Sequence, residues 1–212
     1  MTSIFVNGLS GKMGQSVKDV IAQNKNISIN DKPLSNNHDV VIDFSRPAST
    51  INLLNKCIVF NTPIIIGTTG FSKEELSIIN QTSSEIPILL GYNFSRGVNS
   101  LKKILSKELN QKETNYICEI NETHHKAKID SPSGTALEIK ELRSQKSDIV
   151  IKNISSVRTG KIIGIHEIVL KEKFSKSYRH EALRRDIFAR GAIAAIPYLI
   201  KSKPGLYQYS DL

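Results

Sequence analysis

The sequence predicts an α/β protein: a doubly wound parallel sheet, followed by a second, smaller α+β domain. Two observations lead to this. In the first part of the chain, short apolar runs alternate with helical patterns, and each run ends in a loop rich in Gly, Thr, Asn or Ser. After Ser95, strand patterns follow one another without regular intervening helices.

The expected strands of the first part are continuous apolar runs, which is typical of strands buried on both faces. They cover residues 4–6, 40–44, 63–66 and 87–90, with a cut-down strand at 27–30. Helices are expected at about 13–24, 48–60 and 72–83. Ligands bind beyond the carboxyl ends of the strands in such sheets, where all of the polar loops fall.

The second part is expected to contain helices at about 98–109 and 134–142, and strands at 116–120, 149–157, 164–170 and 173–179. A polar, histidine-rich loop should follow the first of these strands. A strongly apolar helix at about 186–200 is expected to return to the first domain. The predicted domains are therefore 1–95, rejoined by 186–212, and 96–185.

Composition excludes several classes of protein. The net charge is +9, but the basic residues are scattered and aromatic residues are few, so we expect no nucleic-acid partner and a field that gathers small anions. No run of about 18 apolar residues occurs and the N-terminus does not resemble a secretory signal, so no membrane association is expected. Cys57 and Cys118 lie in apolar stretches. We interpret them as buried, reduced thiols of a cytoplasmic protein.

The first motif, Gly8-Leu9-Ser10-Gly11-Lys12-Met13-Gly14, has the spacing G-x-x-G-x-x-G between an expected strand and an expected helix. Glycines permit a tight turn and close approach of a pyrophosphate to backbone N–H groups, and the helix N-terminus adds partial positive charge. We predict a Rossmann-like site for NADH or NADPH. The alternative is an ordinary glycine-rich turn.

A residue near the second strand should contact the adenosine ribose. Asp31 follows this short strand and can bind the ribose hydroxyls, while Lys32 or Lys12 can pair with a 2′-phosphate. A solvated turn is the other interpretation, and the preference for NAD or NADP stays open.

Two further loops follow predicted parallel strands and are expected to line the same dinucleotide. Either loop alone would be an ordinary turn, but with the glycine loop they outline one crevice. These loops are Gly67-Thr68-Thr69 and Gly91-Tyr92-Asn93-Phe94.

The third motif places His124-His125 and Lys128 before a Pro-Ser-Gly-Thr helix start at 132–135. Metal binding is one interpretation, but adjacent histidines diverge on a strand and no third ligand of suitable spacing is evident. A solvated loop is a second. The third is proton chemistry on an anionic substrate, with His or Lys as donor and the backbone N–H groups of Gly134 and Thr135 holding a carboxylate.

The run 122–136 resembles the signature of the dihydrodipicolinate reductase family. Other segments resemble the family in the same order: 8–14, 41–47, 66–71, 93–99, 188–192 and 205–207. One departure is Ile165, which stands before His166 where the family usually has Glu.

The resemblance implies a dinucleotide-binding domain and a substrate-binding domain whose mixed sheet builds a homotetramer. It implies that His124 is the proton donor, Lys128 the second catalytic group, and His125, Gly134 and Thr135 substrate-binding residues. The implied reaction is NAD(P)H-dependent reduction of 4-hydroxy-tetrahydrodipicolinate, a small dicarboxylate, in diaminopimelate and lysine synthesis. Two alternatives remain: a dehydrogenase of another small dicarboxylate, and a non-catalytic dinucleotide sensor.

Overall fold

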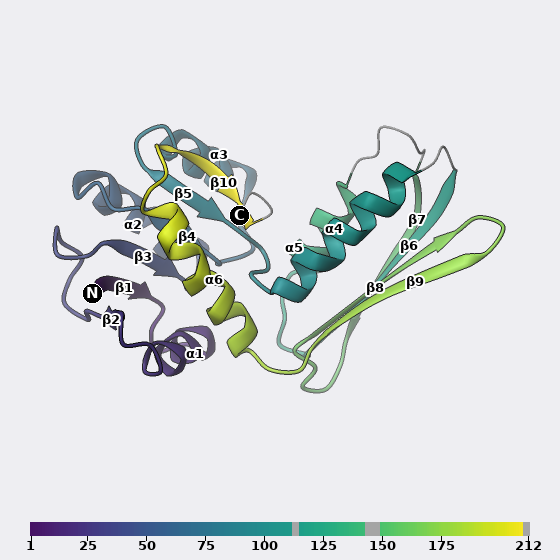
Figure 1. The fold of residues 1–212 in the computed structure, drawn as a ribbon, viewed down its shortest axis with the longest axis horizontal. Helices are drawn as coiled ribbons and strands as arrows, with labels where there is room; N and C mark the ends of the chain where they lie inside the picture. The colour runs from purple at the N-terminus through teal and green to yellow at the C-terminus, as the bar shows by residue number, and fades with distance from the viewer. Residues whose placement is uncertain (112–114, 143–148, 210–212) are drawn as a thin grey trace. The chain divides into compact units, whose positions relative to one another are not determined.

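The computed structural model describes residues 1–111, 115–142 and 149–209 (Figure 1). The chain divides into two compact units. Unit 1 comprises Met1–Ser95 and Arg185–Leu212, and unit 2 comprises Arg96–Arg184. Within the described part of the chain, none of the helices has the length and apolar character needed to cross a bilayer.

Unit 1 is built on a six-stranded sheet in which all pairs are parallel, with the order β10-β5-β4-β3-β1-β2. The predicted doubly wound sheet is therefore confirmed. The edge strand β10 was not predicted, because four half-exposed residues after a proline give a weak strand signal, and pairing with β5 defines it. The strands are β1 (Thr2–Asn7), β2 (Ile27–Ile29), β3 (Val40–Asp43), β4 (Ile64–Ile66), β5 (Pro87–Leu90) and β10 (Gly205–Gln208).

Helices cover both faces of this sheet (Figure 1). Successive side chains of a strand point to opposite faces, so Val40 and Ile42 pack against α1 and α6 while Val41 packs against α2 and α3. Both faces of the sheet are thus apolar, which explains the continuous apolar runs in the sequence. The helices are α1 (Lys12–Ile21), α2 (Pro47–Val59), α3 (Lys73–Thr82) and α6 (Asp186–Leu199).

Unit 2 contains a four-stranded mixed sheet with the order β7-β6-β8-β9. The pair β6–β7 is parallel and the other two pairs are antiparallel. Two helices, α4 (Arg96–Gln111) and α5 (Gly134–Lys140), pack on one face and enclose an apolar core. The strands are β6 (Tyr116–His124), β7 (Ile149–Arg158), β8 (Gly164–Lys171) and β9 (Ser175–Ala182).

Strand β6 is longer than the sequence predicted. It continues through residues 121–124, which were expected to form a loop, and its side chains alternate between buried and more exposed up to His124. Residues 121–124 are all polar, so their hydropathy does not show this alternation. As a result, Glu122 and His124 share the buried face with Ile120.

Candidate active site

The glycine loop of unit 1 connects β1 to α1, as predicted. Gly8 has φ +85°, which favours glycine, and its carbonyl accepts a hydrogen bond from the N–H of Gly11 at 2.9 Å. A Cβ on Gly14 would lie 2.2 Å from the same carbonyl oxygen, so this glycine allows α1 to pack on the loop. Leu9 and Met13 pack against the apolar core of this unit.

The start of α1 suits an anion. Gly11 is the N-cap, so no side chain caps the helix, and the first turn contains no acidic residue. The remaining predicted residues of this loop, Ser10 and Lys12, are exposed. These features fit the pyrophosphate of a dinucleotide. Asp31 is exposed just beyond β2, the neighbour of β1.

Asp43, at the end of β3, connects the tips of the neighbouring strands. Its buried carboxylate accepts hydrogen bonds from Asn7 (2.8 Å), Ser45 (2.5 Å), Thr50 (2.5 Å) and Thr68 (2.8 Å). The hydroxyl of the predicted site residue Thr68 is therefore engaged within the protein. Sequence reasoning did not assign Asp43 a role, although a carboxylate closing an apolar strand was a signal for one.

The other predicted cofactor loops contribute packing as well as polar groups. Phe94 is a core residue, 1% exposed, whose ring contacts Phe44 and Tyr209 edge-on. A Cβ on Gly91 would lie 2.9 Å from the Phe94 ring, and one on Gly67 would lie 2.1 Å from the Phe44 ring. The rings thus account for both glycines, and the side chain of Phe94 is directed into the core. Beside these residues, Thr69, Tyr92 and Asn93 are half-buried.

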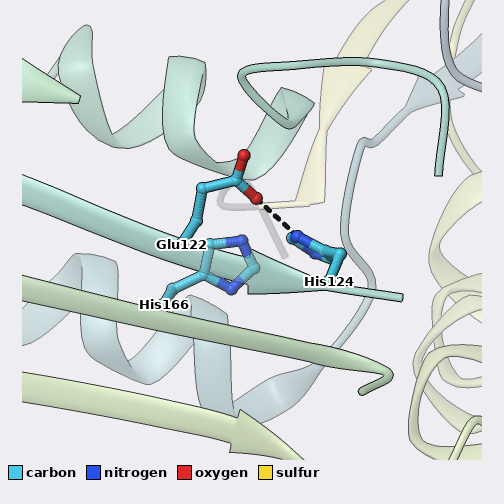
Figure 2. Close-up of side chains that lie close together, drawn as sticks. All are labelled: Glu122, His124 and His166. Atoms are coloured by element: carbon cyan, nitrogen blue, oxygen red, sulfur yellow. Dashed lines mark ion pairs between the residues drawn. The ribbon is translucent and has the colours of Figure 1, made fainter. Parts of the chain in front are cut away.

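In unit 2, three side chains from two strands meet at the end of β6 (Figure 2). Glu122 and His124 lie on one face of β6, and Nδ1 of His124 is 2.5 Å from Oε2 of Glu122. His166 on β8 is the register partner of Glu122, and its ring lies edge-on to that of His124, with 5.1 Å between centroids. All three residues are buried.

Arg158 on β7, the register partner of His124, completes the cluster. Its Nη2 donates to Oε1 of Glu122 at 2.8 Å and to the carbonyl of Asp130 at 2.6 Å. The N–H of Ser133 also donates to Oε1, at 3.1 Å. The Glu122 carboxylate thus connects the sheet to the loop that precedes α5.

The cluster shifts the pKa values of its members. Burial opposes ionisation of Glu122, but hydrogen bonds from His124 and Arg158 outweigh it, and the pKa of this carboxyl falls well below its usual range. The pKa of His166 is lowered to about 3, mainly by burial and further by the charge of His124. His166 is therefore neutral near pH 7.

The structure confirms the helix start predicted after Pro132. Ser133 is the N-cap of α5, and its hydroxyl accepts from the N–H of Ala136, so Gly134 and Thr135 form the buried first turn. Lys128 lies in the preceding loop, where its Nζ is 2.7 and 2.9 Å from the carboxylate oxygens of Asp130. His125 directly follows β6 and is half-buried.

The fold contains a possible metal-ligand set that the sequence did not reveal, and this set does not include His125. Glu122, His124 and His166 could each offer one ligand atom, and these atoms lie within 4.8 Å of one another. However, the guanidinium of Arg158 already binds the same carboxylate, and its positive charge opposes a second cation. The arrangement is better suited to holding and moving a proton at an imidazole. Sequence reasoning missed Glu122, Arg158 and His166 as site residues.

A doubly wound sheet whose glycine loop suits a pyrophosphate, joined to a unit with a buried carboxylate–imidazole cluster, is typical of a nicotinamide-dinucleotide-dependent oxidoreductase. Two family models match the sequence: "Dihydrodipicolinate reductase, N-terminus" over residues 27–94, and "Dihydrodipicolinate reductase, C-terminus" over residues 97–212. The chain belongs to the dihydrodipicolinate reductase family.

Curated relatives are similar over most of the chain. The 4-hydroxy-tetrahydrodipicolinate reductase of Buchnera aphidicola is 38% identical, covering 82% of this chain and 71% of its own. The enzyme of the same name from Bdellovibrio bacteriovorus is 34% identical, covering 99% of this chain and 95% of its own.

Solved structures show the same fold. A dipicolinate-bound dihydrodipicolinate reductase from Paenisporosarcina superposes with a TM-score of 0.70 at 21% identity, covering 98% of this chain and 97% of its own. An amine dehydrogenase from Mycobacterium smegmatis superposes with a TM-score of 0.62 at 9% identity. The superposition covers 99% of this chain and 95% of the dehydrogenase.

Proposed function

We propose that this protein reduces 4-hydroxy-tetrahydrodipicolinate to tetrahydrodipicolinate, using NADH or NADPH, in diaminopimelate and lysine synthesis. The observation that supports this most strongly is the buried Glu122–His124 pair beside the Lys128–Asp130 pair, in a chain of this family. In this proposal the imidazole of His124 donates the proton and the ammonium of Lys128 binds the substrate, and both side chains belong to one short segment.

The proposed cofactor site is the strand-tip edge of unit 1. The loop Gly8–Met13 would hold the pyrophosphate, and the loops 67–69 and 91–94 would contact the remainder of the dinucleotide. Asp31 would accept hydrogen bonds from the adenosine ribose, while Lys32 and Lys12 offer cations for a 2′-phosphate. The cofactor supplies the hydride, and the protein supplies orientation and charge.

The proposed substrate site is the loop between β6 and α5. Lys128 and His125 would bind the carboxylates of the dianionic substrate, with the backbone N–H groups of Gly134 and Thr135. His124 would deliver the proton that accompanies hydride addition, with Lys128 as the second catalytic group. Asp130 holds the ammonium of Lys128 in position through its two carboxylate oxygens.

A coupled assay tests this function. Pyruvate, aspartate semialdehyde and the preceding synthase generate the substrate, and oxidation of NADH or NADPH is followed at 340 nm. We expect turnover by the wild type, and loss of most turnover in His124→Ala and Lys128→Ala while NADH still binds. Near-normal rates in both variants would contradict the assigned roles.

Competition with pyridine-2,6-dicarboxylate tests the substrate class. This planar diacid resembles the substrate, so we expect it to compete with 4-hydroxy-tetrahydrodipicolinate. Turnover only with another small dicarboxylate would favour the alternative dehydrogenase, and dinucleotide binding with no turnover on any diacid would favour a sensor.

The open face of the mixed sheet in unit 2 supports the proposed homotetramer. The helices cover one face, while Ile117, Val150 and Val157 on the other face are 44%, 60% and 46% exposed. Burial of these side chains in a subunit interface would remove apolar surface from water. Light scattering should give a tetramer for the wild type and a smaller species for Val150→Lys; a wild-type monomer would refute the assembly.

Reduced, buried Cys57 and Cys118 agree with a proposed cytoplasmic location.

A further inference from the structure

The two carboxylate oxygens of Glu122 have different partners. Oε1 accepts from the guanidinium of Arg158 and the N–H of Ser133, whereas Oε2 faces Nδ1 of His124 (Figure 2). Because a cation and a backbone group fix Oε1, the direction of Oε2 is set independently of the imidazole. The carboxylate side chain is fully buried, so water does not compete for these bonds.

This contact decides which nitrogen of His124 exchanges a proton with a ligand. A carboxylate accepts hydrogen bonds only, so Nδ1 carries a hydrogen, and the exchangeable proton of the imidazolium is on Nε2. Gly164 on β8 lies beside that atom: a Cβ there would be 3.1 Å from Nε2 of His124. Glycine at this position avoids crowding Nε2.

The neighbouring histidine does not oppose a positive charge on His124. His166 faces it from β8 and is neutral near pH 7, since burial above all lowers its pKa to about 3. His180 on β9 is the register partner of His166, and burial lowers its pKa as well.

The remaining charged groups around the imidazole form compensated pairs. Arg158 on β7 binds Glu122, and Lys128 in the loop binds Asp130. Among the described residues, Glu122 is the one carboxylate that pairs with His124, and it does so through Oε2, the oxygen that Arg158 does not bind.

We propose that Glu122 is a positioning residue: fixed by Arg158, it holds His124 with Nδ1–H toward the carboxylate, stabilises the imidazolium, and makes Nε2 the atom that delivers the proton. The proposal rests on the function proposed above, because it assigns how the proton donor of that reaction is oriented and charged.

The pH dependence of kcat/KM tests the stabilisation of the imidazolium. In Glu122→Gln the opposite charge is lost, so the alkaline fall in kcat/KM should move to lower pH by at least about one unit. Glu122→Asp keeps the charge, so the alkaline fall in kcat/KM should return part of the way to its wild-type pH. The control is Glu138→Gln, which removes a partly buried carboxylate on α5 that pairs with Lys102, and should leave the profile unchanged.

The tautomer of His124 tests the geometry without catalysis. In ¹⁵N NMR spectra of the wild type at high pH, neutral His124 should carry its hydrogen on Nδ1, with the signal assigned by its loss in His124→Ala. A hydrogen on Nε2, or an unshifted profile in a folded Glu122→Gln that still turns over, would overturn the proposal. Absence of reductase activity together with the Nδ1–H tautomer would instead overturn the proposed function alone, since the tautomer does not depend on the substrate.

Discussion

Replacing Arg158 with Met should destabilise the protein through the carboxylate it leaves behind. Arg158 and Glu122 form an ion pair of 2.8 Å in which the side chains are 17% and 0% exposed. Met has a similar length and stays apolar, so the variant removes the charge and the hydrogen bonds while filling much of the space. Glu122 then keeps a negative charge in a buried site with fewer donors.

The free energy of unfolding should fall by about 3 kcal/mol at pH 7.5. This value is at the lower end of the range for breaking a buried ion pair, because His124 and the N–H of Ser133 still bind the carboxylate. The pH dependence should change as well. The pKa of Glu122 in the folded wild type lies below its unfolded value of 4.5, so the pair stabilises the fold above about pH 4.5 and the stability is lost as the pH falls toward the folded pKa. Without Arg158 the pKa of Glu122 is lowered less. The difference in free energy of unfolding between the variant and the wild type should therefore be smaller at pH 4 than at pH 7.5.

Urea unfolding followed by circular dichroism, at pH 7.5 and at pH 4, measures both effects. The matched control is Lys171→Met, which breaks the exposed pair between Lys171 and Glu119 at 2.7 Å. Solvent screens that pair, so the control should stay within experimental error of the wild type. If Arg158→Met loses no more stability than the control, the reasoning about the buried carboxylate is wrong.

Three further predictions concern unit 1 and the thiols. Gly14→Ala places a Cβ 2.2 Å from the carbonyl oxygen of Gly8, so the loop must shift, and NADH affinity measured by fluorescence should fall at least about tenfold. Burial raises the pKa of Cys57 to about 12 and that of Cys118 to about 11, so neither thiol should react with Ellman's reagent at pH 8 until urea unfolds the protein. Asp31→Ala should weaken NADH binding, and leave NADPH binding less affected, if this carboxylate accepts from the ribose hydroxyls; equal loss for both cofactors in a titration would count against it.

Local patterns predicted most elements of the fold. The run ending at Asp43 shows the continuous apolar character of a strand buried on both faces, and the spacing of Gly8, Gly11 and Gly14 marks a turn into a helix. The Ser133 N-cap likewise follows from residues that are adjacent in the chain. Strand β10 escaped prediction because its conformation depends on pairing with β5 rather than on its own residues.

The sequence by itself determined the alternation of strands and helices in unit 1, the glycine loop and the helix start after the His-Lys segment, because each depends on residues within a few positions of one another. Only the tertiary structure decided the partners of His124. Glu122 was visible two residues away, but whether the two share a face depended on the strand continuing to His124. Arg158 and His166 reach the site through the registers of β7 and β8 against β6, which are set by packing of the whole sheet and are not encoded in any short motif.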